Sequence, residues 1–208
     1  MSTNALIRPT TNRQKTIYRN GDTDDIIDVI LQADKLSAEF TQDLAPTLRG
    51  STTEKTLHSV WAFVKENIRY KRDKAGHERI KSPGKLWLDK SGDCKSFSVF
   101  IASVLQNLGI PYKYRFGYYP TGSSGYEKDV NHVFVVAYAN GREYILDAVL
   151  DKFNYQEPFE SGFDLDPNSK GISGIEDLKF SPQIIQFFKW LKWGLAGYGL
   201  YRIIKANS

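Results

Sequence analysis

The 208-residue sequence predicts an α+β fold in which helices occupy the first half of the chain and antiparallel strands follow. Apolar residues recur at helical spacing in three separate runs between residues 23 and 108. After Pro111 the pattern changes to the alternation of strands, and Asn140-Gly141 is the strongest short signal for a β-hairpin. Together these observations predict a core in which a helix packs on an antiparallel sheet.

Composition and charge exclude several classes of protein. The chain is 41% hydrophobic and 25% charged, which is typical of a globular protein and not of a disordered one. Its net charge of +4 is accompanied by no dense stripe of Lys and Arg, so no specific nucleic-acid partner is expected. The single cysteine excludes a disulfide framework, and the three histidines match no metal-ligand spacing. We therefore expect no metal and no cofactor.

The first half of the chain predicts two helices after a polar N-terminal arm. Residues 1–20 carry scattered basic side chains, so we expect them to form an extended arm. Residues 23–40 begin with acidic side chains and continue with an apolar face, which is typical of a helix. Residues 51–54 form a capping box, Ser-Thr-Thr-Glu, and the helix that they open continues toward Ile68 with its apolar side chains on one stripe. This second helix is predicted to be a core helix.

The third helix follows a charged loop over residues 69–79 and a turn over residues 82–84. Asp93 is a natural N-cap, Cys94 falls in the first turn, and an apolar stripe continues until Gly109. Free backbone N–H groups and the helix dipole favour an anion in a first turn, so a thiol there should form a thiolate readily. A free cysteine often only fills a core. Here the apolar stripe begins three residues after Cys94, which argues against that alternative.

Three segments after the third helix predict strands of one antiparallel sheet: residues 112–119, 131–139 and 142–148. A Gly- and Ser-rich stretch separates the first strand from the second. The second and third strands are joined by Asn140-Gly141, which favours a two-residue type I′ turn. Such a turn pairs Ala139 with Arg142 and thereby fixes the register of the hairpin.

This register predicts that a histidine and an aspartate lie together. His132 falls opposite Val149, and Phe134 falls opposite Asp147. Because side chains alternate between the faces of a strand, Asp147 lies on the same face as His132, diagonally one pair away. Diagonal neighbours are about 7–8 Å apart or somewhat less, within reach of long polar side chains. A structural His–Asp hydrogen bond is the alternative to a functional pair.

A cysteine at the start of a helix, a histidine on a strand and an aspartate on its partner are the groups that nucleophilic thiol chemistry requires. Cys94 would attack an acyl carbon, His132 would transfer the proton, and Asp147 would fix the tautomer of the imidazole. Backbone N–H groups at the start of the helix could hold the oxyanion. Trp87 and Asn131 are further candidates for the oxyanion or substrate side of the site, with core filling as the alternative for Trp87.

At these residues the sequence resembles the transglutaminase-like superfamily, over roughly residues 50–155. The resemblance implies a papain-like α+β core with Cys94, His132 and Asp147 as a catalytic triad. The run Asn67-Ile68-Arg69-Tyr70 resembles the bacterial and phage-associated branch, but that branch often has Asp-Asp where this chain has Lys95-Ser96, which bears on substrate preference. The matching motifs are Gly92-Asp93-Cys94, Leu108-Gly109-Ile110-Pro111, Asn131-His132-Val133 and Tyr144-Ile145-Leu146-Asp147-Ala148, with Glu78 and Ser82-Pro83 as further matches to the branch.

The resemblance implies a thiol-dependent acyl transfer on amide bonds. The superfamily includes peptidases, amidases, crosslinking enzymes and inactive members, and the sequence shows no calcium-ligand loop, so a calcium-activated crosslinker is disfavoured. We expect a cysteine peptidase or amidase, or a transglutaminase-type enzyme, whose substrate is a protein or peptide with an amide acyl donor. The alternative is a non-catalytic assembly module, for example of a phage particle, that docks through its C-terminal segment.

The sequence suggests four regions. They are an N-terminal arm and helix (1–50), the transglutaminase-like catalytic core (51–155), a polar loop region (156–181) and a basic aromatic helical segment (182–208). The last segment is interrupted by lysines, so a core-covering helix is expected first, a surface for a protein partner or a membrane through residues 182–205 second, and a spanning helix last. The N-terminus has no apolar segment of a signal peptide, so a cytoplasmic location is expected, with a virion as the alternative.

Overall fold

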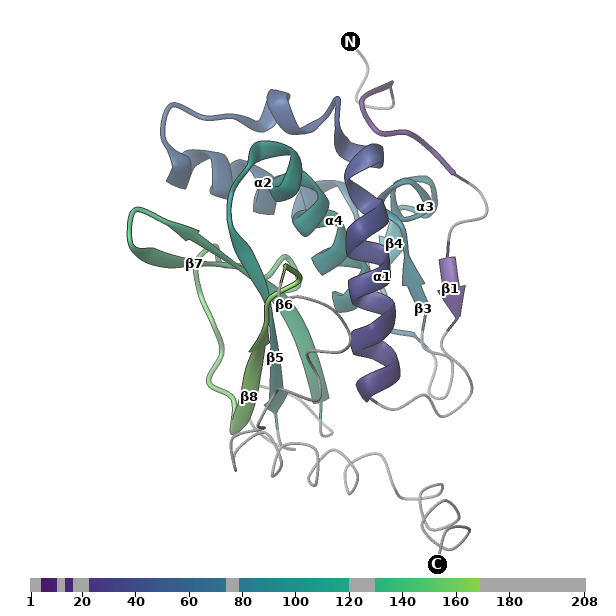
Figure 1. The fold of residues 1–208 in the computed structure, drawn as a ribbon, viewed down its shortest axis with the longest axis vertical. Coiled ribbons are helices and arrows are strands. Elements are labelled where there is room, and N and C mark those ends of the chain that lie inside the picture. The colour runs from purple at the N-terminus through teal and green to yellow at the C-terminus, as the bar shows by residue number, and fades with distance from the viewer. Residues whose placement is uncertain (1–4, 11–13, 17–22, 74–78, 120–129, 169–208) are drawn as a thin grey trace, which may run out of the picture. The chain divides into compact units, whose positions relative to one another are not determined.

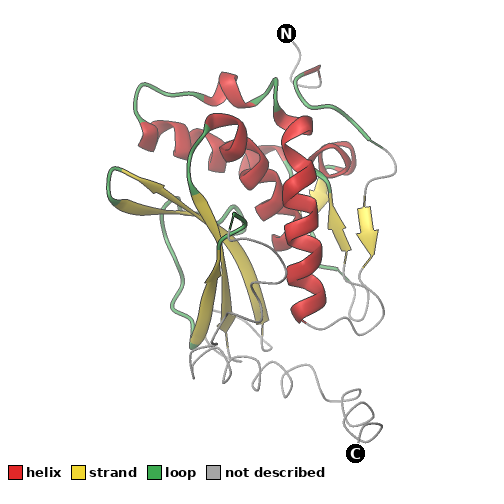
Figure 2. Ribbon diagram, viewed as in Figure 1, coloured by secondary structure: helices red, strands yellow, loops and turns green. Residues whose placement is uncertain are grey.

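The computed structural model describes residues 5–10, 14–16, 23–73, 79–119 and 130–168. The longer helices come first in the chain: α1 (Thr23–Thr41), α2 (Thr53–Asn67), α3 (Pro83–Asp89) and α4 (Cys94–Leu108). The strands of the four-stranded sheet follow: β5 (Tyr112–Tyr119), β6 (Val130–Ala139), β7 (Arg142–Leu146) and β8 (Ser161–Leu165). Figures 1 and 2 show this change from helix to strand along the chain, which confirms the predicted α+β class.

Helix α4 is the central helix of its unit, and nearly all of its residues are buried. Helices α1, α2 and α3 pack around it (Figure 1). Asp93 caps its start, since its carboxylate Oδ1 accepts a hydrogen bond from the Ser96 N–H at 3.1 Å. Gly109 ends it with a left-handed conformation at φ 68°. Both ends of the helix are therefore where the sequence predicts them.

The start of α2 corrects the predicted capping box by one residue. The N-cap is Thr52 and not Ser51, and the Thr52 hydroxyl accepts a hydrogen bond from the Lys55 N–H at 3.2 Å. Thr52 has the extended backbone that an N-cap requires. Because Lys55 now takes the third helical position, the return half of a capping box has no carboxylate to form it. A short 3-10 helix, η2 (Ala45–Leu48), precedes this start.

Helix α3 is a further correction, because a turn was expected where it begins. The Ser82 hydroxyl caps it by accepting from the Lys85 N–H at 3.3 Å, and Pro83 occupies the first position, where no N–H is needed. Short strands form in the N-terminal arm and on both sides of α3 in the chain. These are β1 (Gln14–Thr16) in the expected arm, which pairs with β3 (Arg79–Lys81), and β2 (Arg69–Tyr70), which pairs with β4 (Ser91–Gly92).

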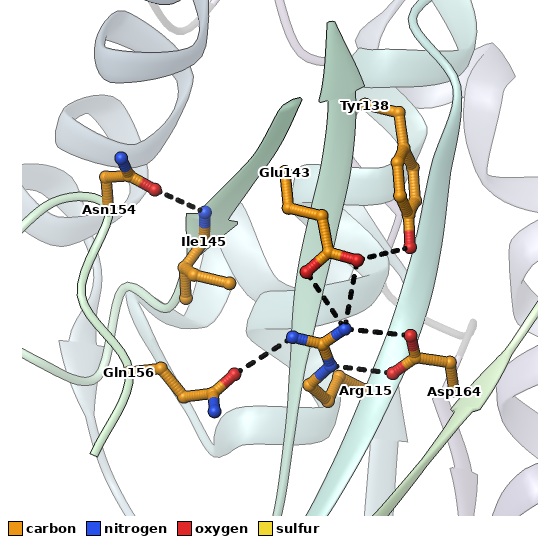
Figure 3. A network of polar contacts seen from close by, with 7 residues as sticks. All are labelled: Arg115, Tyr138, Glu143, Ile145, Asn154, Gln156 and Asp164. Atoms are coloured by element: carbon orange, nitrogen blue, oxygen red, sulfur yellow. Dashed lines mark hydrogen bonds and ion pairs between the residues drawn. The ribbon is translucent and has the colours of Figure 1, made fainter. Parts of the chain in front are cut away.

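Strand β8 lies in the stretch that was expected to be a polar loop, so that expectation is wrong for residues 161–165. The sheet order is β7-β6-β5-β8, and a polar network accompanies this pairing (Figure 3). Arg115 of β5 donates to Asp164 of β8 at 2.7 and 2.8 Å and to Glu143 of β7 at 3.1 and 3.3 Å. Gln156 accepts from the same guanidinium at 3.1 Å. The strand is thus held by contacts with distant residues.

The hairpin of β6 and β7 has the predicted register. Ala139 pairs with Arg142, and the described pairing continues to Val135 with Leu146. Asn140 and Gly141 both have positive φ, 51° and 72°, as a type I′ turn requires. Strand β7 ends at Leu146, two residues before its expected end. His132 and Asp147 lie beyond this pairing, so their predicted position on the same face of the hairpin remains a prediction.

The chain divides into two compact units. In the second unit, the Tyr119 ring lies edge-on to the His132 ring at a centroid distance of 6.1 Å and edge-on to Phe159 at 6.0 Å. In the first unit, the core includes Ile7 of the expected N-terminal arm, which is fully buried. The first unit comprises residues 1–115, 133–156 and 164–167, and the second comprises residues 116–132, 157–163 and 168–208.

A buried carboxyl group links α1 to β5. Oδ1 of Asp34 accepts hydrogen bonds from the hydroxyl groups of Tyr112 and Tyr114, both at 2.6 Å. Burial raises the pKa of Asp34 above its ordinary value of 3.8, and it outweighs these hydrogen bonds, which act in the opposite direction. The folded chain therefore binds a proton at Asp34 more tightly than the unfolded chain does, and the stability from this group is lost as the pH rises through its folded pKa.

Replacing Asp34 with asparagine is expected to remove this pH dependence, because the carboxyl group that titrates is gone. The amide oxygen can still accept from both hydroxyl groups, so the contact itself is kept. The unfolding free energy of the wild type, relative to Asp34→Asn, should fall by about 1.4 kcal/mol per pH unit from pH 3.8 up to the folded pKa and stay constant above it. Urea unfolding of both chains over this pH range measures the difference. Parallel stability curves for the two chains would contradict the expectation.

Candidate functional site

Cys94 is the first residue of α4 and is buried, with 9% of its surface exposed. The residues on either side of it form an ion pair, since the Lys95 ammonium contacts Oδ2 of the Asp93 carboxylate. Both partners are buried. The two oxygens of Asp93 therefore have separate tasks, because one caps the helix and the other neutralises a buried lysine. Removing either partner would deprive the other buried charge of this ion pair.

The backbone before Cys94 is held from two directions. Strand β4 pairs in parallel with β2, and the Lys71 N–H donates to the Gly92 carbonyl at 2.7 Å. The Lys81 ammonium donates to the Ser91 carbonyl at 2.8 Å and pairs with Asp89 at 2.8 Å. Burial raises the pKa of Asp89, but the hydrogen bonds from its two lysine partners outweigh burial and leave that pKa below its ordinary value.

A side chain at Gly92 would force the Leu86 side chain to move. A Cβ atom at this position would meet the Leu86 Cδ1 atom at 2.4 Å, which is closer than side-chain atoms can approach. The glycine therefore lets the chain pass close to α3 directly before the helix of the cysteine.

Tyr70 is a site neighbour that the sequence analysis did not identify. Its ring lies edge-on to Phe97 of α4 at a centroid distance of 6.0 Å, and register places it opposite Gly92. Partial burial, together with the negative charges at Cys94 and Asp93, raises the pKa of Tyr70 well above its ordinary value of 10.0. The phenol of Tyr70 therefore keeps its proton to a higher pH than an ordinary tyrosine does.

Asp147 follows β7 directly and is buried. Oδ1 of its carboxylate accepts from the Val149 N–H at 3.0 Å, and its backbone carbonyl accepts from the indole N–H of Trp61 at 2.8 Å. The Lys65 ammonium donates to the Val149 carbonyl at 2.9 Å and pairs with the Asp151 carboxylate at 2.6 Å. Helix α2 thus contacts the segment that carries Asp147 at more than one point.

His132 is buried in β6 and belongs to the second unit, and Cys94 and Asp147 belong to the first. That His132 lies close to Cys94 and Asp147 remains a prediction. Within the first unit, the hydroxyl of Ser98 donates to the carbonyl of Val133 at 3.0 Å, and both groups are buried. The first turns of α4 therefore lie against β6 at Val133, the residue that follows His132 in the chain.

The structure places Trp87 within an aromatic cluster. Trp87 is buried and stacks on Phe63 of α2 at a centroid distance of 5.4 Å, and the Lys90 ammonium lies over its ring. Phe63 in turn stacks on Phe100 of α4 at 6.0 Å. Asn131 belongs to β6, and its side chain is outside the part that the structure describes. The roles of Trp87 and Asn131 in oxyanion or substrate binding remain predictions.

The described residues contain neither a metal-binding cluster nor a membrane-spanning helix. No group of three or more His, Cys, Asp and Glu side chains among them could hold a metal ion. No helix within the same ranges is long and apolar enough to span a membrane. Residues 182–208, predicted to form a basic aromatic helical segment, lie outside the described residues.

Sequence analysis also did not identify the contacts of Trp61 and Lys65. One signal was present, because the two residues are four apart and so lie on the same face of α2. The periodicity of α2 indicates only that Trp61 belongs to a core stripe. For Lys95 no local signal exists, because the pattern around a lysine at the start of a helix does not show that it is buried.

Comparison with known families gives a match between residues 38–164 and the transglutaminase-like superfamily. No curated protein matches the chain.

Among solved structures, a candidate cysteine protease from Cytophaga hutchinsonii is 20% identical, with a TM-score of 0.43 and coverage of 74% of this chain and 53% of that protein. A TGase is 13% identical, with a TM-score of 0.39 and coverage of 67% and 36%. LapG of Legionella pneumophila, treated with EGTA, is 18% identical, with a TM-score of 0.43 and coverage of 78% and 97%. The chain thus spans about half of the first structure and about a third of the second.

Proposed function

The chain belongs to the transglutaminase-like superfamily, and from this membership we propose that it is a cysteine-dependent enzyme acting on amide bonds of proteins or peptides. The proposed residues are Cys94 as nucleophile, His132 as the base and acid, and Asp147 as the group that orients the histidine. The bacterial and phage-associated branch of the superfamily is part of the same proposal. It is based on the motifs around residues 67–70 and 82–83.

The hydrogen bond from Ser98 to Val133 is the observation that carries the proposal. Cys94 and Ser98 are four residues apart in α4 and therefore lie on the same face of the helix, one turn from each other. Ser98 directs this face toward β6, and its partner Val133 is the neighbour of His132 in the chain. This arrangement supports a thiol that faces the strand of the histidine.

The proposed reaction forms and then breaks one covalent bond to Cys94. The imidazole of His132 takes the proton of the thiol, and the thiolate attacks the carbonyl carbon of the amide. Backbone N–H groups at the start of α4 hold the oxyanion of the tetrahedral intermediate. The C–N bond then breaks, and the imidazolium protonates the leaving amine. Water or a second amine then attacks the thioester and gives a proton to His132. The C–S bond breaks, and the Cys94 thiolate leaves and takes this proton back.

Lys95 is proposed to act on the start of the helix and not directly on substrate. It occupies the position after the nucleophile, but it is buried and its ammonium pairs with Asp93. Since Asp93 also caps α4, the pair is expected to fix the first turn, on which the position of the Cys94 thiol depends.

The acyl-enzyme provides the test of this proposal. The wild type is incubated with a panel of peptide amides, including peptides that contain glutamine, and the chain is examined by intact mass spectrometry and peptide mapping. An acyl adduct on Cys94 that is removed by water or by added hydroxylamine is expected, with no adduct in Cys94→Ser. Folded wild type that forms no adduct with any member of the panel, or adducts on lysine only, would contradict the proposal.

A further inference from the structure

The contacts between α2 and the segment after β7 concern two residues outside the predicted triad. Resting on the function proposed above, we propose that Trp61 and Lys65 are positioning residues for Asp147. They act through the backbone of residues 147–149, to which both donate hydrogen bonds. Neither residue is proposed to touch the substrate or the reacting atoms.

Trp61 makes the more deeply buried of the two contacts. Its indole N–H donates to the Asp147 carbonyl at 2.8 Å, and both residues are buried. The ring is confined by neighbours, with centroid distances of 5.7 Å to His58 and 5.8 Å to Phe153. A ring confined in this way holds its N–H in a fixed direction, which defines where the carbonyl of Asp147 can accept this hydrogen bond.

Lys65 holds the same segment two residues later. Its ammonium donates to the Val149 carbonyl at 2.9 Å and pairs with Asp151 at 2.6 Å. Because Trp61 and Lys65 are one helical turn apart, a single face of α2 supplies both contacts. The ion pair itself is solvent-exposed on the side of Asp151, so the hydrogen bond to the carbonyl is the part that fixes the backbone.

The backbone contacts reach the carboxylate through Val149. The N–H of this residue donates to Oδ1 of Asp147 at 3.0 Å, which fixes one oxygen of the carboxylate relative to the held backbone. A group that orients a catalytic histidine must be held to within about 0.5 Å to act well. Without the donor of Trp61, the buried carbonyl of Asp147 would lose its shorter hydrogen bond and keep the one from the Leu150 N–H at 3.3 Å, so the segment would be held less firmly.

The test compares Trp61→Phe with Tyr112→Phe. Each variant keeps an aromatic ring in the core and removes one buried donor, but the hydroxyl of Tyr112 contacts Asp34. The measurement is the rate of Cys94 alkylation by iodoacetamide between about pH 5 and 9, because the thiolate is the reacting form. Trp61→Phe is expected to lower the rate below about pH 7 by roughly fivefold, the effect of one hydrogen bond, and Tyr112→Phe is expected to leave it unchanged.

Combination with Asp147→Asn separates positioning from a general loss of stability. If Trp61 acts through Asp147, Trp61→Phe should have no further effect on alkylation in the Asp147→Asn background. An equal effect in both backgrounds, or equal profiles for Trp61→Phe and wild type, would overturn the inference while leaving the proposed function in place. A wild-type profile identical to that of His132→Ala would instead overturn the proposed function and the inference with it.

A second pair of variants keeps the test decisive if Trp61→Phe does not fold. Lys65→Met removes the donor to Val149, and Lys55→Met on the same helix is its control, because Lys55 is exposed. Lys65→Met is expected to lower the same alkylation rate about twofold, in keeping with a partly exposed contact, while Lys55→Met has no effect. Equal rates for the two variants would overturn the role of Lys65.

Discussion

Replacing Cys94 with serine is expected to lower the rate of amide cleavage by at least about 10⁴-fold, because a hydroxyl is a far weaker nucleophile than the thiolate that the proposed reaction uses. The chain has no other cysteine that could take over the reaction. The fold should be retained, because serine has nearly the same size and Cys94 is the first residue of a helix whose cap and core remain.

Two measurements on Cys94→Ser check this expectation. Turnover of the amide that forms the acyl-enzyme gives the loss of activity, and urea unfolding should give a stability within about 1 kcal/mol of wild type. Ser103→Ala is a matched control, since it removes a buried polar group of the same helix that contacts Thr41 and Phe100. This control should keep its activity. Residual turnover above one per cent of wild type in Cys94→Ser would be incompatible with a cysteine nucleophile.

Replacing Asp147 with asparagine is expected to lower the same turnover by about 10²- to 10⁴-fold. The amide can still accept the hydrogen bond of the Val149 N–H through its oxygen, so the turn after β7 keeps its shape. What it loses is the negative charge that, in the proposed triad, stabilises an imidazolium and selects the reactive tautomer of His132. The loss is therefore expected in the rate of the chemical step more than in stability.

Asp43→Asn is the control for this substitution, because Asp43 is exposed and pairs only weakly with Arg8, at 4.0 Å. The turnover of Asp43→Asn should equal that of wild type. Equal turnover of Asp147→Asn and Asp43→Asn, with both chains folded, would show that Asp147 has a structural role only.

The parts of the fold that sequence reasoning predicts correctly are those fixed by nearby residues. Asp93 and Gly109 mark the ends of α4 because the cap and the left-handed stop are local interactions. The register of the hairpin follows from Asn140-Gly141 alone, because a two-residue turn of this kind permits one pairing. The resemblance to the superfamily is based on the same short motifs, and family comparison confirms it.

The parts that it does not predict depend on contacts between distant residues. Strand β8 is held by Asp164, which contacts Arg115 from 49 positions away, and its own five residues show no strand pattern. The indole N–H of Trp61 donates to the carbonyl of Asp147, which lies 86 positions later in the chain. Periodicity shows that Trp61 lies on the buried face of its helix, but it does not show which polar group the indole N–H will meet.

The central claim, that His132 activates Cys94, is tested most directly by the rate of Cys94 alkylation against pH in wild type and in His132→Ala. A pair of thiolate and imidazolium keeps the thiol reactive in acid, so rapid alkylation of the wild type is expected to persist below about pH 7 and to be lost in the variant. Profiles that coincide, with both rates rising only toward about pH 8.5 as for an ordinary thiol, would contradict the claim. That result would favour a non-catalytic member of the superfamily.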